Sequence, residues 1–309
     1  MFAILLLCIL SGCKGDAKNG NAAQRTVGAS ATGFSGDAAY NYAKAQVAFG
    51  PRVPGTPAAK QAGDWIIRQM RARADTVIVQ SFTYTTADGK KLALRNILAR
   101  FRPELSNRVL YLTHWDSRPI SESATTEAEK KMPVPGANDG ASGVGMFVAL
   151  GDVLKKTKPN VGVDLLFTDG EDYGQFGPPD VDVLIGAKYF ATHLPSPGYK
   201  PLYGVLWDMI GDKDLRIPYE MNSFQQVPDV VSRVWQTAAD LGHADVFVQE
   251  SGGQITDDHM PLLNAGLRVI DVIDLTYPPH HTPYDTMDKI SAKSLGIVGD
   301  VATALVTRR

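Results

Sequence analysis

Three acidic residues surround one glycine in the stretch FTDGEDYG, residues 167–174. Asp169, Glu171 and Asp172 come directly after the apolar run VGVDLLF, which has the composition of a buried strand. Carboxylates this close together repel one another and raise each other's pKa unless a cation or shared protons hold them. The pattern therefore leaves two interpretations, an acidic surface turn or one edge of a metal or acid–base site.

Other acidic residues and histidines also follow apolar or glycine-rich segments. They are His114 and Asp116 in THWDS, Asp139 in GANDGASG, Asp208 in WDMIGD, Asp257, Asp258 and His259 in TDDH, and His280 and His281 in HHTPYDT. Four of the six histidines of the chain belong to this set. In an open α/β sheet, ligands bind beyond the carboxyl ends of the strands, so we expect these side chains to meet there around a cation.

The residue types favour zinc as that cation. Imidazole and carboxylate ligands without thiolate are typical of a catalytic zinc that keeps an open coordination position. Calcium would prefer more oxygen ligands and no histidine. The two cysteines, Cys8 and Cys13, both lie in the N-terminal segment, so we expect neither a zinc thiolate site nor a cysteine nucleophile.

Alternating strand and helix patterns would position these residues. Strands are predicted at residues 76–85, 95–101, 108–116, 161–169, 203–212 and 267–275. Helices are predicted at residues 37–49, 58–74, 142–157, 185–194, 227–242 and 291–309. This alternation predicts an α/β three-layer sandwich, in which helices flank both faces of a largely parallel, mixed central sheet. We expect residues 36–309 to form one catalytic domain.

Composition and charge exclude some classes of protein. The chain has 309 residues, of which 44% are hydrophobic and 21% are charged, as in an ordinary globular protein. Its formal net charge is -2 at pH 7, and no basic run is interleaved with aromatic residues. We therefore expect no nucleic-acid partner.

The N-terminal segment has a different character. Residues 1–12 are apolar and end in small residues, which is typical of a signal peptide. The sequence LSGC resembles the lipobox of bacterial lipoproteins, which implies a lipid on Cys13. A plain secretory signal or a fragment of an anchor helix are the alternatives. Residues 13–35 are rich in Gly, Ala, Ser and Asn and are predicted to form a flexible tether. The expected location is the bacterial cell envelope, with the lipid as the only membrane contact.

The ordered set THWDS, GANDGASG, DGED, WDMIGD and HHTPYDT resembles the zinc aminopeptidase superfamily, which folds like bacterial leucyl aminopeptidase. The resemblance covers roughly residues 40–305. RVPGTP, DGED, WDMIGD and ITDDHMPLLNAGLRVID are similar to the glutaminyl cyclase (glutaminyl-peptide cyclotransferase) branch of that superfamily.

The glutaminyl cyclase resemblance implies one zinc ion with three ligands, namely Asp139, Asp172 and His281. It implies that Glu171 is the general acid and base, and that Asp208 and Asp257 share protons with it. The implied reaction converts the N-terminal Gln of peptides or proteins to pyroglutamate and releases ammonia. The attacking group is the amine of the substrate itself, which agrees with a chain that offers no thiol nucleophile.

An aminopeptidase on the same scaffold is the main alternative. It would hold two zinc ions, with His114 and Asp208 completing the second site and Asp139 bridging both. Glu171 would then activate a water molecule that hydrolyses the N-terminal peptide bond. Asp257 favours the cyclase, because the peptidase pattern has Ser at that position. A non-catalytic binding protein is a third hypothesis, and the intact Glu171 speaks against it.

The chain departs from the cyclase pattern at two positions. Asp172 stands where that pattern has Glu, and His280 stands where it has a Trp that lines the glutamine pocket. The loop HHTPYDT is also more similar to its peptidase version. Three aromatic residues remain as expected pocket walls beside His280, namely Tyr277, Phe176 and Trp207. We further expect Asp285 to orient His281 or its loop, because zinc-binding histidines commonly donate to a carboxylate.

Overall fold

The computed structural model describes residue 2 and residues 32–308. The expected signal peptide, the expected lipid on Cys13 and all but the last residues of the expected tether lie outside the described residues. Among the described residues, no helix combines the length and apolar character needed to cross a bilayer.

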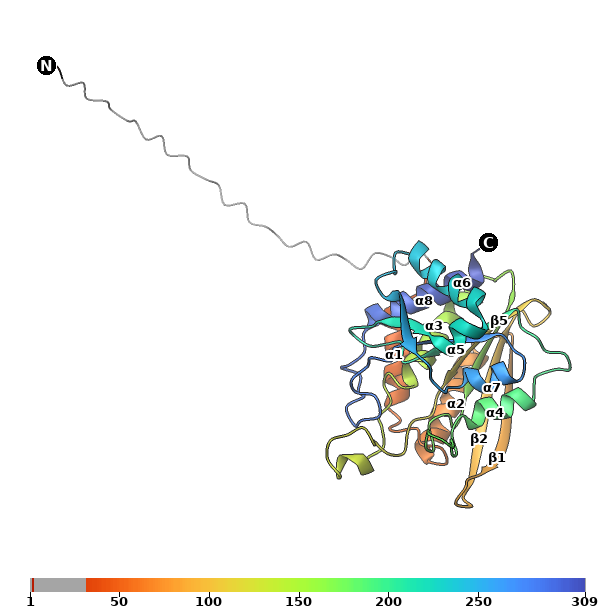
Figure 1. Ribbon diagram of the computed structural model, residues 1–309. Helices are drawn as coiled ribbons and strands as arrows, with labels where there is room; N and C mark the ends of the chain where they lie inside the picture. The colour runs from red at the N-terminus through yellow and green to blue at the C-terminus, as the bar shows by residue number, and fades with distance from the viewer. Residues whose placement is uncertain (1, 3–31, 309) are drawn as a thin grey trace.

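A six-stranded sheet forms the centre of the molecule (Figure 1). In spatial order its strands are β1 (Thr76–Thr85), β2 (Lys91–Phe101), β4 (Gly162–Thr168), β3 (Arg108–His114), β5 (Tyr203–Asp208) and β8 (Val269–Ile273). Strand β2 runs antiparallel to both neighbours, and β4, β3, β5 and β8 are parallel to one another. These four parallel strands are buried along their whole length, as expected for a sheet covered on both faces.

Helices cover both faces of the sheet and complete the predicted three-layer sandwich (Figure 1). On one side of the sheet lie α2 (Pro57–Arg71), α3 (Ala141–Lys156), α6 (Pro228–Asp240) and α8 (Ala292–Thr307), and α1 (Gly36–Val47) packs against α3 and α8. The other face packs against α4 (Ile185–Thr192) and α7 (His259–Asn264). Successive side chains of β3 point to opposite faces of the sheet. Tyr111 therefore packs in the core on the first face and Leu112 in the core on the second.

Four short elements were not predicted. They are the 3₁₀ helix η1 (Glu129–Lys131), strands β6 (Ile217–Glu220) and β7 (Phe247–Gly253), and helix α5 (Met221–Gln226). Strands β6 and β7 pair in parallel as a separate two-stranded sheet. Strand β7 is mostly exposed and ends in two glycines, so it lacks the apolar alternation that reveals a strand. It leads directly into the segment that contains Asp257.

Two glycines allow α3 to start close against the end of β3. A Cβ atom on Gly140 would lie 2.8 Å from Cε1 of His114, and one on Gly143 would lie 2.0 Å from Oγ1 of Thr113. Side chains at these positions would push the helix away from the strand. The glycines of GANDGASG therefore keep Asp139, two residues before the first residue of the helix, within reach of His114.

Candidate metal centre and acid cluster

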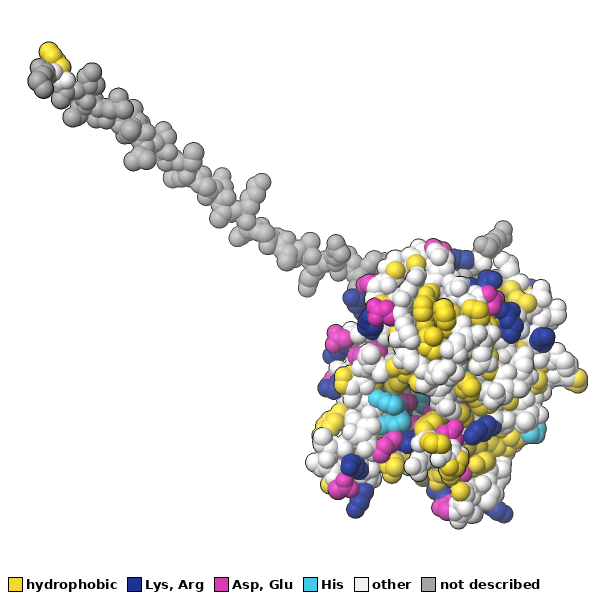
Figure 2. All heavy atoms as spheres, viewed as in Figure 1, with side chains coloured by type: hydrophobic (Ala, Val, Ile, Leu, Met, Phe, Trp, Pro, Cys, Tyr) yellow, Lys and Arg dark blue, Asp and Glu magenta, His cyan; other side chains and the backbone are white. Residues whose placement is uncertain are grey.

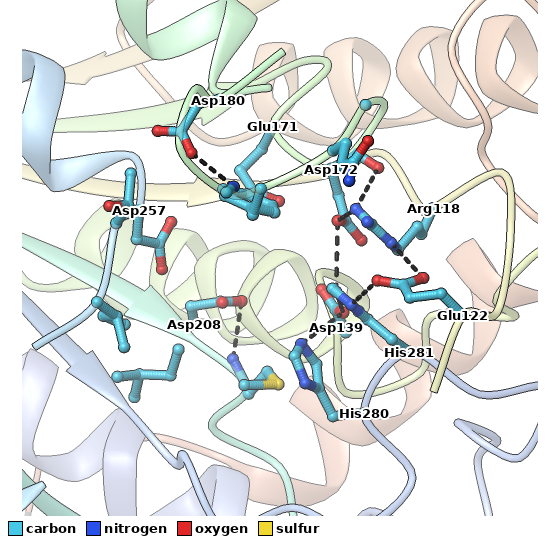
Figure 3. Close-up of a pocket in the computed structure, with 18 of the residues that line it drawn as sticks. Arg118, Glu122, Asp139, Glu171, Asp172, Asp180, Asp208, Asp257, His280 and His281 are labelled. Atoms are coloured by element: carbon cyan, nitrogen blue, oxygen red, sulfur yellow. Dashed lines mark hydrogen bonds and ion pairs between the residues drawn. The ribbon is translucent and has the colours of Figure 1, made fainter. Parts of the chain in front are cut away.

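A cavity of about 1040 Å³ lies beyond the carboxyl ends of β4 and β5. Figure 2 shows histidine and acidic side chains gathered around a hollow on this face, and Figure 3 shows the cavity in close-up. Its ionisable lining consists of Arg118, Glu122, Asp139, Glu171, Asp172, Asp180, Asp208, Asp257, His280 and His281. The residues that follow different strands in the sequence are thus brought to one place.

Asp139, Asp172 and His281 lie around one part of the cavity, where the imidazole of His281 faces both carboxylates. Nε2 of His281 lies 3.7 Å from Oδ2 of Asp139 and 3.4 Å from Oδ1 of Asp172. Atoms that bind one zinc at about 2 Å lie roughly 3 to 4 Å apart. Oδ2 of Asp139 and Oδ2 of Asp172 are both buried and have no hydrogen-bond partner. Buried carboxylate oxygens without partners are costly, so the site fits a cation.

Among the described residues, two groups of three side chains have donor atoms that all lie within 4.8 Å of one another. One group contains Asp139, His280 and His281, and the other contains His114, Asp139 and Asp208. Asp139 belongs to both groups, as a carboxylate that bridges two metal ions would. Asp172 belongs to neither group, and its Oδ1 lies 2.6 Å from Nη1 of Arg118.

Glu122 holds the imidazole of His281. Oε1 of Glu122 lies 2.7 Å from Nδ1 of His281, which leaves Nε2 of that ring facing the two aspartates. Oε2 of Glu122 accepts a 2.7 Å hydrogen bond from Nε of Arg118, whose other end binds Asp172. No sequence pattern marks Glu122 or Arg118, because they follow THWDS in a loop without regular structure.

Of the two roles expected for Asp285, orienting the ring of His281 is wrong, because Glu122 holds that ring. Asp285 does bond Tyr277 in the loop that carries His281. Its oxygens accept hydrogen bonds from the backbone N–H groups of Asn138, at 2.8 Å, and of Asp139, at 3.1 Å. It also accepts a 2.6 Å hydrogen bond from the hydroxyl of Tyr277. Asp285 therefore fixes the backbone of the loop that carries Asp139, across 146 residues of sequence.

Asp116 fixes the backbone of the acidic loop in a similar way. One oxygen accepts a 3.1 Å hydrogen bond from the N–H of Glu171, and the other accepts a 3.2 Å bond from the N–H of Asp172. The side chains of these neighbours point to different parts of the cavity (Figure 3). Burial, followed by the charge of Asp172, raises the pKa of Glu171 well above its usual value.

Glu171, Asp208 and Asp257 face the cavity from three segments (Figure 3). Burial and the nearby charge of Asp208 raise the pKa of Asp257 well above its usual value. Carboxyl groups in such surroundings hold protons that carboxylates in water would release. His114 lies among them, with Nε2 at 2.9 Å from Asp139 and 3.3 Å from Asp208. Neither ring nitrogen of His114 has the alignment of a hydrogen bond.

The acid cluster continues into the protein interior through His259, which was among the expected residues, and through Asp271 and Glu220, which were not. Burial and the charge of Asp257 raise the pKa of Asp271, which lies on β8. The imidazole of His259 lies between Asp271, at 3.6 Å, and Glu220, at 3.4 Å. Glu220 in turn accepts hydrogen bonds at the start of α5, including one from Ser223. His259 is therefore enclosed behind the cavity.

Two of the four expected pocket residues line the cavity, and two do not. Phe176 and His280 line it, and the ring of Phe176 lies 5.8 Å from the guanidinium carbon of Arg118. Trp207 lies fully buried in the core with its ring edge-on to Tyr111, and Tyr277 is 3% exposed. The expectations for Trp207 and Tyr277 were wrong. Aliphatic residues form the apolar wall instead, namely Ile120, Met209, Ile255, Ile273 and Leu275.

Comparison with known families matches residues 96–306 of this chain to peptidase family M28. The described fold is similar to a Zn-dependent exopeptidase of Parabacteroides distasonis, with 35% identity and a TM-score of 0.84, covering 89% of this chain and 99% of that one. It is also similar to a glutaminyl cyclase of Porphyromonas gingivalis, with 36% identity and a TM-score of 0.85, covering 88% and 97% of the two chains.

Curated relatives are more distant in sequence. The aminopeptidase YwaD of Bacillus subtilis is 24% identical over 264 residues, which cover 80% of this chain. The match covers only 49% of that relative's length. Structures and sequences similar to this chain thus include both cyclases and peptidases, and the choice between the two activities depends on the site.

Glu122→Ala should weaken zinc binding without unfolding the protein. Loss of the carboxylate frees the imidazole of His281, and removal of such supporting partners costs about 10- to 100-fold in metal affinity. Competition with a zinc chelator measures the effect. Glu127→Ala, on an exposed residue of the same loop, is the control and should leave affinity unchanged. Equal affinities in both variants would contradict the role given to Glu122.

Proposed function

This chain belongs to peptidase family M28, and we propose that within this family it is a glutaminyl-peptide cyclotransferase. The proposed substrates are peptides or proteins with N-terminal Gln, and the products are N-terminal pyroglutamate and ammonia. One feature carries the proposal, which is the presence of Asp257 in the cavity beside Glu171 and Asp208.

Asp257 distinguishes the two activities because it changes what Asp208 can do. The charge of Asp208 contributes, after burial, to the raised pKa of Asp257, so the two carboxyl groups lie close enough to interact. In the proposed arrangement Asp208 stays with Asp257 and Glu171 and is a poorer ligand for a second metal ion. A serine in place of Asp257 would remove that competition and leave Asp208 free to bind metal.

Asp139, Asp172 and His281 are the residues that we propose to hold one zinc ion. The bound ion would supply Lewis acidity to the γ-carboxamide oxygen of the substrate glutamine. Hydrogen bonds hold these three residues in place: Glu122 bonds His281, Arg118 bonds Asp172, and Asp285 bonds the backbone of Asp139. The apolar wall of the cavity would exclude water, which favours internal attack over hydrolysis.

Glu171 is the proposed proton carrier. The α-amine of the substrate forms a bond to the carbonyl carbon of the γ-carboxamide and loses a proton to Glu171. The same proton then passes to the departing amide nitrogen as its bond to that carbonyl carbon breaks, so that ammonia leaves. A carboxyl with a raised pKa suits both steps. Asp208 and Asp257 would hold Glu171 in place and buffer its charge, and the enclosed cavity would keep the amine close to the carboxamide.

Aminopeptidase activity is the second candidate. The observation that favours it is the position of Asp139 in two donor groups, one with His281 and one with His114 and Asp208. With two metal ions, Glu171 would take a proton from a water molecule that attacks the N-terminal peptide bond. Incubation with Gln-Ala and Leu-Ala distinguishes the candidates, because a cyclase releases ammonia from the first and a peptidase releases free leucine from the second.

Glu171→Gln should abolish release of ammonia from Gln-Ala and leave zinc bound. The amide cannot accept the proton, and loss of a general acid–base group costs about 10²- to 10⁴-fold in rate. The proposed zinc ligands are unchanged. Zinc content by elemental analysis is measured on the same sample. If the variant loses its zinc, then Glu171 rather than Asp172 binds the metal and the two roles are exchanged.

Asp257→Ser should reduce cyclisation by about 10²-fold or more, because it removes one carboxyl from the cluster. Asp180→Ser is the matched control, since Asp180 lines the same cavity but lies in the loop of residues 173–182 and bonds the backbone of Gly177. The initial rate of ammonia release is compared for both variants. Full activity of Asp257→Ser would remove the main reason for preferring a cyclase.

For the N-terminal segment we propose cleavage after residue 12 and a lipid on Cys13, which would tether the catalytic domain to a membrane of the bacterial cell envelope. The sequence LSGC supports this proposal. The full chain should then partition into the membrane fraction, and Cys13→Ala should be released from it. Equal partitioning of both chains would contradict the lipid anchor.

A further inference from the structure

His280 lies beside His281 at the edge of the donor group. The centroids of the two imidazole rings are 3.7 Å apart, with an angle of 35° between the planes. Nε2 of His280 lies 4.0 Å from Oδ2 of Asp139, and Nε2 of His281 lies 3.7 Å from the same oxygen. Figure 3 shows the two rings next to Asp139.

Both imidazole rings approach the same carboxylate oxygen, Oδ2 of Asp139. Asp139 is 4% exposed, and its Oδ2 has no hydrogen-bond partner. A buried carboxylate oxygen that faces two imidazole nitrogens without bonding either one is expected where a cation binds all three. The three donor atoms lie within 4.8 Å of one another, which a single zinc with ligands at about 2 Å can span after small side-chain movements.

We propose that His280 is a second imidazole ligand of the zinc, in addition to His281 and Asp139. The inference rests on a zinc ion at the site proposed above, and it holds for either activity. It also gives a reason for a histidine at a position where the cyclase pattern has a Trp.

Neighbouring side chains fix His281 and Asp139 but not His280, so His280 is the most weakly held of these proposed ligands. Glu122 fixes the ring of His281, and Asp285 fixes the backbone of Asp139. The side chain of His280 is 43% exposed, whereas that of His281 is 12% exposed. Zinc can accept a fifth ligand or exchange one during catalysis. His280, at the solvent side, can therefore bind the metal without closing the site permanently.

Asp172 is compatible with this arrangement. Its Oδ1 is held by Arg118, and its Oδ2 has no hydrogen-bond partner and so remains available. Asp139, Asp172 and the two histidines would then supply four protein donors. Alternatively, His280 serves only as an aromatic wall of the cavity, which it lines. The two roles are separable, because phenylalanine can replace an aromatic wall but cannot bind zinc.

X-ray absorption at the zinc edge, on the full zinc-loaded chain, counts the imidazoles bound to metal. Elemental analysis of the same sample gives zinc per chain. We expect His280→Phe to remove one zinc-bound imidazole per chain, and to lower zinc affinity in chelator competition by about 10-fold or more. His193→Phe is the control, because His193 lies at the end of α4 and stacks on Tyr189. It should change neither value.

An unchanged imidazole count together with unchanged zinc affinity in His280→Phe would overturn the inference. A wild-type chain that releases leucine rather than ammonia would overturn the proposed cyclase function, but it would leave the role of His280 standing. The two failures are thus distinguishable, because one is measured by metal binding and the other by the product formed.

Discussion

The burial of many carboxylates at one edge of the sheet is the constraint on which this site depends. The acids concerned are Asp139, Asp172, Glu171, Asp208, Asp257 and Asp271, and each is at most 7% exposed. Buried charges of one sign are unfavourable unless they are paired, protonated or bound to metal. The few cationic groups nearby, chiefly Arg118 and the histidines, cannot neutralise all of them. A bound divalent cation and protons shared among the carboxyl groups would supply the remaining balance.

The buried carboxylates fall into two groups on two sides of the cavity. On one side, Asp139, Asp172 and His281 converge on a point where a metal ion would lie, and hydrogen bonds from the surrounding loops hold them. On the other side, Glu171 belongs to a set of carboxyl groups with raised pKa that extends inward to His259. Asp116 links the two groups, because its carboxylate accepts hydrogen bonds from the backbone N–H groups of Glu171 and Asp172, whose side chains point to opposite sides of the cavity.

The sequence predicted the sheet, its main helices and the convergence of the acidic strand ends, because these depend on periodicity and on the rule that parallel strands end together. It could not predict Glu122, which reaches His281 across 159 residues from a loop without a pattern. Trp207 and Tyr277 show a second limit. The type of an aromatic residue and its place near a strand end do not reveal whether its ring packs into the core or lines the cavity, because that depends on the packing around it. Asp271 was missed for a similar reason, since an acid within an apolar strand gives no signal of its neighbours.

The proposed arrangement has one metal ion between Asp139 and His281, while Asp208 remains with the acid cluster. Anomalous diffraction at the zinc edge, from crystals of zinc-loaded protein, would locate every bound ion. We expect one anomalous peak per chain, next to Oδ2 of Asp139 and Nε2 of His281. A second peak of similar height between His114 and Asp208, next to Asp139, would rule out this arrangement and favour a peptidase.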